Sequence, residues 1–326
     1  MANIYRDVTL QNVSENDIGK QMKVSGWVEN IRDHGGVSFI DLRDMYGVLQ
    51  VVIREPELLK GIKKEECISI DGVMEQRDEE TYNPKIPSGT IELEAKKITV
   101  LGQVYQQVPF EIQTSKEVRE DVRLKYRYLD LRNPDVKSRI ILRSRIVADL
   151  RAAMIGHDFM EITTPILTCS SPEGARDYLV PARNHPGKFY ALPQAPQQFK
   201  QLLMASGFDR YFQIARCFRD EDLRADRQPE FTQADMELSF VDIDDVIDVN
   251  ERLLKFVFKE AIGVDVQIPL QRMPWQEAMD RFGSDKPDTR FGMELVDVSE
   301  TVKGCGFGVF TGALENGGSV RGINVE

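Results

Sequence analysis

The spacing of the apolar residues changes once along this chain, and that change limits what the chain can fold into. Up to residue 102 the apolar residues gather in short stretches, separated by turn-forming pairs such as Gly35-Gly36 and Tyr46-Gly47. The expected strands are 22–31, 37–43, 48–53, 66–76 and 90–101. Five short strands within about 100 residues predict a small β-sandwich or barrel, of which the five-stranded OB-fold is one type.

Beyond residue 135 the period becomes helical. An apolar stripe with a spacing of four runs through 136–157 and consists of Leu142, Ile146, Leu150 and Met154. Further helices are expected at 196–206 and 243–261, and strands at 210–218 and 231–240. Helices mixed with an antiparallel hairpin predict an α+β domain. Residues 103–135 have no clear period and carry mixed charge, which indicates a hinge.

The composition excludes several kinds of protein. Of 326 residues, 41% are hydrophobic and 29% are charged, as in ordinary soluble globular proteins. The net charge of −11 argues against a protein that coats nucleic acid non-specifically, so RNA binding would depend on specific contacts. No apolar run is long enough for a membrane helix and the N-terminus has no signal core, so we expect a cytoplasmic protein without membrane contact. The spacing of the cysteines predicts no metal site.

In the β-rich part, strand alternation places an aromatic, an amide and a carboxylate, Phe39, Gln50 and Glu92, away from the core. Because successive residues of a strand point to opposite faces, Phe39 lies opposite Ile40 and Leu42. The outer face should also carry Asp41, Arg43, Gln50 and Glu92. Exposed aromatic rings on OB-type sheets stack on unpaired bases, so the pattern indicates a nucleic-acid surface. The alternative, a surface aromatic covered by a loop or a neighbouring domain, stays open.

The expected hairpin at 210–240 is the stronger candidate for a site. Alternation on its second strand places Phe231, Gln233, Asp235 and Glu237 on one face, and Ala234, Met236 and Leu238 on the other. A strand with one apolar and one polar side suits the floor of a site for a polar ligand. Arg219, where the loop begins, has a planar guanidinium that matches phosphate oxygens. A solvated hairpin with a charge-rich tip is the alternative.

Two further segments carry the residue types of an amino-acid clamp. Residues 170–177 form a loop rich in Ser, Pro and Gly with a carboxylate at Glu173, a composition that suits a mobile lid. Gln197 and Lys200 are three apart at the start of a helix, so they share a face. A solvated first helical turn is the alternative. The sequence has no Walker-type or dinucleotide-type glycine loop, and its histidines form no obvious triad.

Four runs of the sequence resemble the bacterial-type aspartyl-tRNA synthetases, and the similarity extends over the whole chain. They are Leu124–Arg132, Ser171–Tyr178, Phe189–Gln194 and Cys217–Gln233. The resemblance implies an N-terminal five-stranded OB-fold β-barrel that reads the anticodon, then a hinge and a partial class II synthetase core on an antiparallel sheet. Pro165 resembles the motif 1 proline of the dimer interface, and residues 216–240 resemble motif 2.

The same resemblance implies domain boundaries. The expected parts are the OB-fold anticodon-binding domain at 1–107, the hinge at 108–135, the class II core at 136–287 and the beginning of an insertion domain at 288–326. The run Gly283–Asp288 at the start of the insertion favours the bacterial aspartyl type. By this resemblance, we expect the sequence to stop inside the insertion and before motif 3. We therefore expect a fragment of a longer ligase that is inactive alone.

The implied reaction activates L-aspartate with ATP, which carries Mg²⁺, and passes the aspartyl group from aspartyl-adenylate to the terminal ribose of tRNA. Arg219 is the implied catalytic residue, at the α-phosphate and the aspartate carboxylate. The implied ATP-binding residues are Arg219, Asp220, Glu221, Gln228 and Phe231, which would stack on adenine. The implied aspartate-binding residues are Glu173, Gln197 and Asp235 around the ammonium, Lys200 at the side-chain carboxylate, and Arg219. Ala195 stands where relatives often carry serine.

The implied anticodon-binding residues are Arg32, His34, Phe39, Gln50 and Glu92. His34 would face the third anticodon base, where a histidine resembles relaxed enzymes that charge tRNA(Asn) as well as tRNA(Asp). A polar turn residue without this role is the alternative for His34. The full-length parent is expected to be a homodimer. Three other functions stay open: a stand-alone tRNA anticodon-binding module, a synthetase-like enzyme that makes an amino acid without tRNA, and an asparaginyl- or lysyl-tRNA synthetase.

Overall fold

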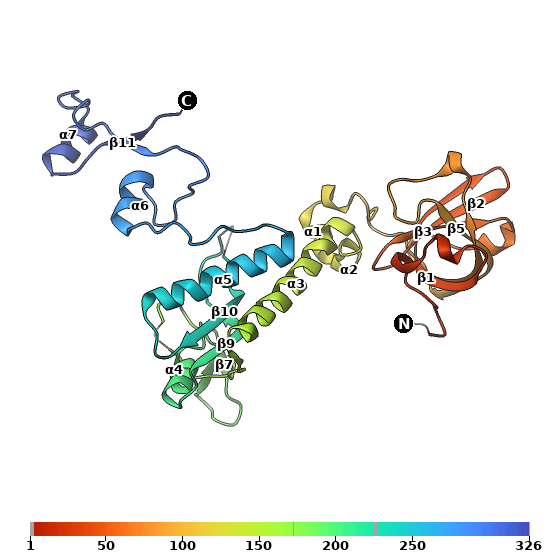
Figure 1. The fold of residues 1–326 in the computed structure, drawn as a ribbon, viewed down its shortest axis with the longest axis horizontal. Coiled ribbons are helices and arrows are strands. Elements are labelled where there is room, and N and C mark those ends of the chain that lie inside the picture. The colour runs from red at the N-terminus through yellow and green to blue at the C-terminus, as the bar shows by residue number, and fades with distance from the viewer. Residues whose placement is uncertain (1–2, 172, 225–226, 326) are drawn as a thin grey trace. The chain divides into compact units, whose positions relative to one another are not determined.

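The structure is a computed structural model that describes residues 3–171, 173–224 and 227–325 (Figure 1). Its internal contacts divide the chain into two compact units, Met1–Ser138 and Arg139–Glu326. Three residues of the runs quoted above, Pro172, Ala225 and Asp226, lie outside the described residues. No helix in the described part of the chain is both long enough and apolar enough to cross a membrane.

The first unit contains a closed five-stranded barrel with the strand order β1-β2-β3-β5-β4. Its strands are β1 (Gln21–His34), β2 (Val37–Arg43), β3 (Val48–Ile53), β4 (Cys67–Gln76) and β5 (Ile91–Gly102). Short 3₁₀ helices flank and connect them: η1 (Leu10–Asn12), η2 (Glu15–Asp17), η3 (Pro56–Leu59) and η4 (Glu79–Thr81). The five predicted strands are confirmed, and β1 continues to His34, three residues past its predicted end.

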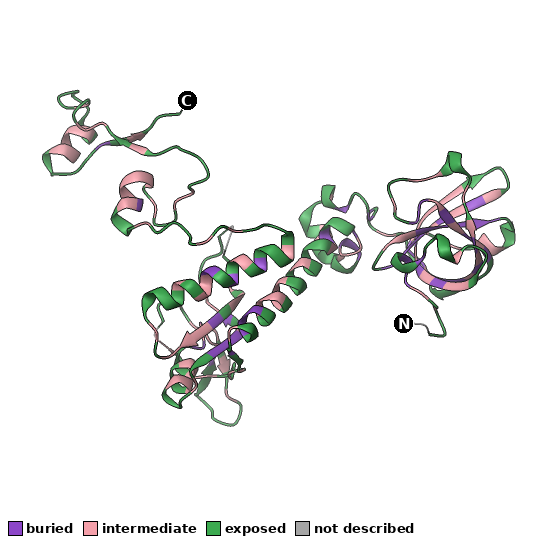
Figure 2. Cartoon of the chain, in the orientation of Figure 1, coloured by how far each residue is buried: buried purple, intermediate pink, exposed green. Residues whose placement is uncertain are grey.

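Alternating apolar residues fill the interior of the barrel, where Figure 2 shows buried segments on every strand. Ile40 and Leu42 are fully buried, as alternation predicts. Closure of the barrel brings strands close together at Gly26 and Gly72. A Cβ atom at Gly26 would lie 2.4 Å from the carbonyl oxygen of Arg43, so only glycine fits there.

Residues beyond β5 form a small helical cluster within the first unit. Its helices are η5 (Ser115–Glu117), α1 (Glu120–Lys125) and α2 (Arg127–Asp130). Phe110, Ile112 and Leu129 form its core. The carboxylate of Asp130 is fully buried and accepts hydrogen bonds from the Ser115 hydroxyl at 2.9 Å and from Arg123 Nε at 3.1 Å. The prediction that 108–135 acts as a hinge stays a prediction.

A buried charge cluster joins this helical segment to the barrel. Glu65 accepts hydrogen bonds from Arg43 at 2.8 Å and from Arg132 at 2.6 Å. The Arg132 guanidinium also lies 5.1 Å from the centre of the Trp27 ring. The prediction that Arg43 faces solvent is wrong, because Glu29 and Glu65 cover and pair it.

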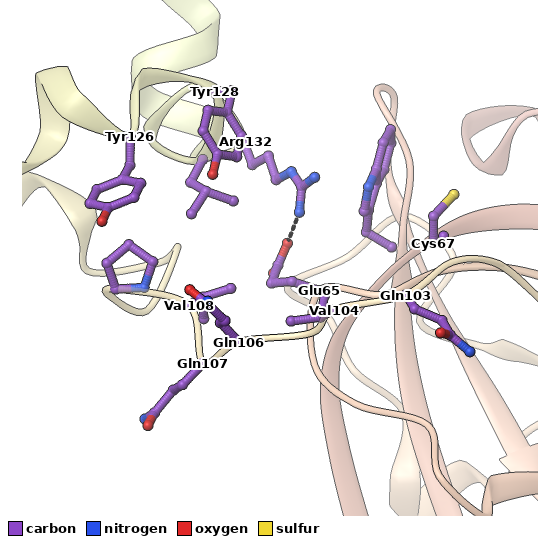
Figure 3. Close-up of a pocket in the computed structure, with 14 residues that line it drawn as sticks. Glu65, Cys67, Gln103, Val104, Gln106, Gln107, Val108, Tyr126, Tyr128 and Arg132 are labelled. Atoms are coloured by element: carbon purple, nitrogen blue, oxygen red, sulfur yellow. Dashed lines mark hydrogen bonds and ion pairs between the residues drawn. The ribbon is translucent and has the colours of Figure 1, made fainter.

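A cavity of about 430 Å³ adjoins the Glu65–Arg132 pair (Figure 3). Tyr126 and Tyr128 line it from the helical segment, and Cys67 lines it from the barrel. Glu65 and Arg132, which line the cavity, already form a hydrogen bond with each other. We therefore interpret the cavity as a packing gap between the barrel and the segment that follows it.

The second unit is built on a three-stranded sheet with the order β10-β9-β6. Its strands are β6 (Met160–Glu161), β9 (Arg210–Phe218) and β10 (Glu230–Leu238), and a separate pair is formed by β7 (Leu179–Pro181) and β8 (Phe189–Ala191). β9 and β10 are antiparallel as predicted, but β6 runs parallel to β9. The long connection between β6 and β9 allows this parallel crossover, so the expectation of an antiparallel sheet is correct only for the hairpin.

Helices cover one face of this sheet. They are α3 (Pro134–Gly156), which begins in the first unit, and α5 (Ile243–Ile262), while α4 (Gln197–Ala205) precedes β9. Met154, Phe159, Phe212, Leu253 and Val257 are buried in the shared core. Asp242 caps α5 together with Asp245, and Gly263 ends the helix with a left-handed φ of 74°. The three predicted helices are thus confirmed to within two residues at each end.

The last part of the chain contains two helices and a short strand pair. These elements are α6 (Trp275–Phe282), β11 (Leu295–Asp297), α7 (Gly308–Glu315) and β12 (Arg321–Ile323), with β11 antiparallel to β12. The assignment of 288–326 to an insertion domain stays a prediction.

We predict that Asp130→Ala destabilises the chain by about 3 kcal/mol, because it leaves buried partners of the carboxylate unpaired. Chemical denaturation measures this loss, and Glu120→Ala, an exposed carboxylate in the same segment, is the control. Burial alone would raise the pKa of Asp130, but the hydrogen bonds from Arg123 and Ser115 lower it. The stabilisation is therefore complete above the unfolded pKa of about 3.9 and is lost as the pH falls through the lower folded value. Equal stability of the two variants would contradict this prediction.

Candidate functional site

The hairpin of β9 and β10 has one apolar and one polar face, as alternation predicts. Met236 and Leu238 pack on the core beneath α3 and α5. On the other face Asp235 pairs in register with Gln213, and Phe231 pairs with Cys217. Ala234 was expected on the apolar face but is exposed, because the core lies under the other end of the strand. The hairpin therefore has one polar surface, the polar floor, which carries Gln213, Cys217, Phe231 and Asp235.

Arg219 follows β9 directly and lies over the ring of Phe231, with its guanidinium 5.1 Å from the ring centre. Its backbone N–H donates to the carbonyl of Pro229 at 2.9 Å, which closes the base of the loop. The Nε atom of Arg219 is buried and has no hydrogen-bond partner in the part of the chain that the structure describes. A buried guanidinium nitrogen without an acceptor is costly, so this arrangement suits a ligand that supplies one.

A cavity of about 300 Å³ opens beside this pair. It gathers four of the residues predicted to bind ATP, which are Arg219, Glu221, Gln228 and Phe231. It also includes Arg227, Asp222 and Leu223, which the sequence reasoning did not select. Asp220 lines a neighbouring cavity instead, where its N–H donates to the carbonyl of Arg176 at 2.9 Å.

Lys200 of α4 lies over the same polar face. Its ammonium is 3.0 Å from Asp235 Oδ1 and 3.2 Å from Glu237 Oε2. Burial alone would lower the pKa of Lys200, but the two carboxylates outweigh burial and raise it. Glu237, the second partner of Lys200, was not among the predicted site residues, although alternation had placed it on this face.

Two buried oxygen atoms on this floor have no hydrogen-bond partner among the described residues. They are Oδ2 of Asp235 and the hydroxyl of Tyr211. Burial, and then the negative charge of Asp235, raise the pKa of Tyr211 well above its usual value. Asp235 is thus a nearly buried carboxylate with one oxygen bound to Lys200 and the other left to accept a further donor.

Cys217 also lies on the floor and donates its S–H to Gln233 Oε1 at 3.3 Å. Burial, and then the charge of Asp235, raise the pKa of the Cys217 thiol to about 11. A thiol that stays protonated at neutral pH is a poor nucleophile, so Cys217 packs the site and does not react in it.

Glu173 and Gln197, the other two residues predicted to bind the aspartate ammonium, are exposed. Glu173 accepts a hydrogen bond from the Ser171 hydroxyl at 3.0 Å, and Gln197 is the first residue of α4. In the described part of the chain, neither makes a hydrogen bond to Lys200 or Asp235. The structure thus brings together four of the residues predicted to bind ATP, and it pairs Lys200 with Asp235. Glu173 and Gln197 lie outside these two groups.

The outer face of the barrel carries a chain of hydrogen bonds among the predicted anticodon residues. Arg32 donates to Asp41 at 2.7 Å and to Gln50 Oε1 at 3.0 Å, and Gln50 Nε2 donates to Glu92 at 2.6 Å. The prediction that Gln50 points to solvent is wrong, since Arg32 and Glu92 cover it and only 7% of it is exposed. Asp41, which holds Arg32, was not among the predicted site residues.

Phe39 is half-buried on this face, and His34 is exposed. Their rings form an edge-to-face pair with centres 5.9 Å apart. Neighbouring strands thus carry an aromatic ring, a guanidinium, an amide and a carboxylate. These are the groups that bind unpaired bases.

Comparison with known proteins agrees with this geometry. The family model described as tRNA synthetases class II (D, K and N) matches residues 119–307, and the model described as OB-fold nucleic acid binding domain matches residues 22–101. Because the first match covers more than half of the chain, the chain belongs to the class II tRNA synthetases of this group. It is a homologue of bacterial aspartyl-tRNA synthetases.

The chain is 61% identical to the aspartate–tRNA ligase of Agathobacter rectalis, in a match that covers 100% of the chain and 55% of that protein. It is 56% identical to the aspartate–tRNA(Asp/Asn) ligase of Lachnoclostridium phytofermentans, with the same coverage. The chain therefore spans about half the length of the curated relatives it matches.

A solved structure shares the fold. The asparaginyl-tRNA synthetase of Pyrococcus horikoshii, in complex with asparaginyl-adenylate, superposes with a TM-score of 0.70 at 21% identity. The match covers 81% of this chain and 59% of that chain. The fold class is thus an N-terminal five-stranded OB-fold barrel followed by part of a class II catalytic domain.

The raised pKa of Cys217 gives a test of the buried floor. We predict that iodoacetamide at pH 8 modifies the exposed Cys169 and Cys305 and leaves Cys217 unmodified, and that Cys217 reacts only as the pH approaches about 11. Peptide mass spectrometry measures the modification of each cysteine. Modification of Cys217 at pH 8 as fast as that of Cys305 would show that the floor is open to solvent.

Proposed function

We propose that this chain is the anticodon-binding domain and the first part of the catalytic domain of an aspartate–tRNA ligase. The ligase activates L-aspartate with ATP and transfers the aspartyl group to tRNA(Asp). The observation that carries the proposal is a pair of buried atoms, Arg219 Nε and Asp235 Oδ2, on or beside the polar floor of one hairpin, which have no hydrogen-bond partner among the described residues. The Arg219 Nε–H suits an anionic ligand group and the Asp235 oxygen suits a cationic one. An amino acid joined to a phosphate supplies both.

The nucleotide would occupy the cavity beside Arg219. Phe231 offers a ring face for adenine, while Glu221 and Gln228 offer acceptors and donors for the sugar and base. Arg219 lines this cavity and lies over Phe231 of the polar floor, so its guanidinium would contact both an α-phosphate and a carboxylate. Asp220 would contribute from the adjacent loop. Mg²⁺ would enter as part of the ATP substrate.

Aspartate would lie above the Lys200–Asp235 pair. The Asp235 Oδ2 atom can accept from the substrate ammonium, and the Lys200 ammonium can add the substrate side-chain carboxylate to its present partners. Glu173 and Gln197 would complete the ammonium contacts from the edge of the site. A lysine held by two carboxylates is fixed in position, which favours one chain length of acidic substrate.

The chemical step then needs little more than positioning. A substrate carboxylate oxygen attacks the α-phosphorus, the bond to the bridging oxygen breaks, and pyrophosphate leaves with that electron pair. Arg219 stabilises the charge that gathers on the α-phosphate oxygens. In the second step the ribose hydroxyl of tRNA attacks the aspartyl carbonyl, the bond from that carbon to the phosphate oxygen breaks, and AMP leaves with this electron pair while its phosphate accepts the hydroxyl proton.

The barrel would bind the anticodon. Phe39 would stack on one base, and the Arg32–Gln50–Glu92 chain would present fixed donors and acceptors to the others. We further propose a cytoplasmic homodimer, with Pro165 near the subunit interface.

We predict that Arg219→Ala abolishes aspartate-dependent ATP–pyrophosphate exchange in a polypeptide that carries this sequence at the full length of its relatives. Loss of one charged donor at the reacting group lowers such rates by about 100-fold or more. Arg216→Ala is the matched control, because Arg216 is an exposed arginine of β9 that lies on the face opposite Cys217 and pairs with Glu230. Exchange by the Arg219 variant within about tenfold of wild type would refute the assignment.

We predict that Phe39→Ala weakens binding of tRNA(Asp) to the 326-residue chain by about 1–3 kcal/mol, which is the contribution of one stacked base. Filter binding measures the affinity. Tyr105→Ala is the control, since Tyr105 is exposed and lies outside the barrel strands. An unchanged affinity for the Phe39 variant would exclude this surface.

We propose that His34 makes the ligase accept tRNA(Asn) as well, because a neutral imidazole offers both a donor and an acceptor to the base it meets. Aminoacylation of both purified tRNAs by the full-length form tests this, with His34→Leu beside wild type. We expect comparable charging by wild type and a selective loss of tRNA(Asn) charging in the variant. Rejection of tRNA(Asn) by wild type by about 100-fold would leave only the strict aspartyl function.

A further inference from the structure

The side chain of Gln194 makes three hydrogen bonds to a loop that lies 17 to 19 residues away in sequence. Its Oε1 accepts from the backbone N–H of Ala175 at 3.2 Å, and its Nε2 donates to the carbonyl of Ala175 at 2.8 Å. The same Nε2 donates to Asp177 Oδ1 at 2.6 Å. Only 2% of Gln194 is exposed, so these bonds have little competition from water.

Asp177 closes the loop at its base. Its second oxygen, Oδ2, accepts from the Ser170 hydroxyl at 2.5 Å. Burial alone would raise the pKa of Asp177, but the hydrogen bonds from Ser170 and Gln194 lower it. Asp177 is therefore an ionised acceptor at neutral pH, and this fixes the Gln194 amide with its nitrogen toward Asp177.

The loop that is held in this way carries Glu173. Gln194 fixes Ala175, two residues from Glu173, and the Ser170–Asp177 bond joins the two sides of the loop. Glu173 itself is exposed, and its carboxylate accepts from the nearby Ser171. The base of the loop is therefore fixed, and the exposed Glu173 is accessible to a ligand.

The same loop also contacts the end of β9. Asp220 donates its N–H to the carbonyl of Arg176, the residue next to the one that Gln194 holds. Gln194 itself lies three residues before α4, which carries Lys200. One buried amide thus connects the Glu173 loop, the start of the Lys200 helix and the backbone beside Arg219.

We propose that Gln194 is a positioning residue that sets the affinity for the amino-acid substrate by fixing the loop that carries Glu173. The proposal rests on the proposed function, in which Glu173 contacts the substrate ammonium. Glutamine suits this place because its amide copies a peptide group and offers a donor and an acceptor to both backbone atoms of Ala175. Leucine keeps the volume and loses every bond, whereas glutamate loses both donors and faces the ionised Asp177.

The first experiment measures the loop in the 326-residue chain without any ligand. Hydrogen–deuterium exchange followed by mass spectrometry reports the peptide that contains Ala175. In Gln194→Leu we expect this amide to exchange about tenfold faster or more, while peptides of β9 and β10 keep their rates. Gln201→Leu, an exposed glutamine of α4, is the control. Unchanged exchange at Ala175 would overturn the proposal.

The second experiment measures ATP–pyrophosphate exchange in a polypeptide of the relatives' full length. We expect Gln194→Leu to raise KM for aspartate by about tenfold or more, with KM for ATP changed less than about threefold. Gln194→Glu should behave similarly. Adding Asp177→Asn to it restores one hydrogen bond with donor and acceptor exchanged, so the double variant should recover part of the aspartate affinity.

The outcomes separate this proposal from the proposed function. A wild-type protein without aspartate-dependent exchange would contradict the function, while the hydrogen exchange result still decides whether Gln194 holds the loop. An active wild type whose Gln194→Leu variant keeps its KM for aspartate within about twofold would overturn the positioning role alone. An equal rise of both KM values would also overturn it, because that result indicates general damage to the fold.

Discussion

The polar floor of the second unit depends on one constraint, the alternation of side chains along β10. Since each residue points away from its neighbours, the strand can pack Met236 against the core and hold Asp235 on the ligand face at adjacent positions. A shift of one residue in the register with β9 would exchange these faces and put a carboxylate into the core. The apolar packing beneath α5 therefore fixes the position of the charged groups above it.

The free energy of burying a charge, as well as geometry, limits where charged groups can lie on this floor. Lys200 and Asp235 are both nearly buried, which is tolerable only because they pair at 3.0 Å. Three buried atoms on or beside this face, on Arg219, Asp235 and Tyr211, have no hydrogen-bond partner in the described part of the chain, where the other such atoms belong to Arg77 and Asp149. Stability alone does not favour such atoms, and three of them around one face are more typical of a binding site than of a salt-bridged surface.

The sequence allowed much of this to be predicted, for physical reasons that differ between the two units. In the barrel, short alternating strands and glycine turns predicted all five strands, because alternation is a local property. Alternation also placed Phe39 and Glu92 on the outer face. It did not predict that Gln50 and Arg43 are covered, in each case by long side chains from elsewhere in the chain. Pairing between strands distant in sequence leaves no trace in a local pattern.

The same limit applies to the second unit. The polar face of β10 was predicted from alternation, whereas the roles of Arg219 and Lys200 came from family resemblance. Gln194 was visible only as part of a matching run, since its partners lie 17 to 19 residues away and include backbone atoms. Glu237 was on the predicted face, and only the position of α4 shows that it pairs with Lys200.

We propose that this floor selects aspartate and that the full-length ligase attaches it to tRNA(Asp). The most direct measurement is aminoacylation of purified tRNA(Asp) by a polypeptide that carries this sequence at the full length of its relatives, with radiolabelled aspartate, asparagine or lysine offered separately. We expect ATP-dependent attachment of aspartate and no attachment of the other two amino acids. Attachment of asparagine or lysine, or no attachment of any amino acid, would contradict it.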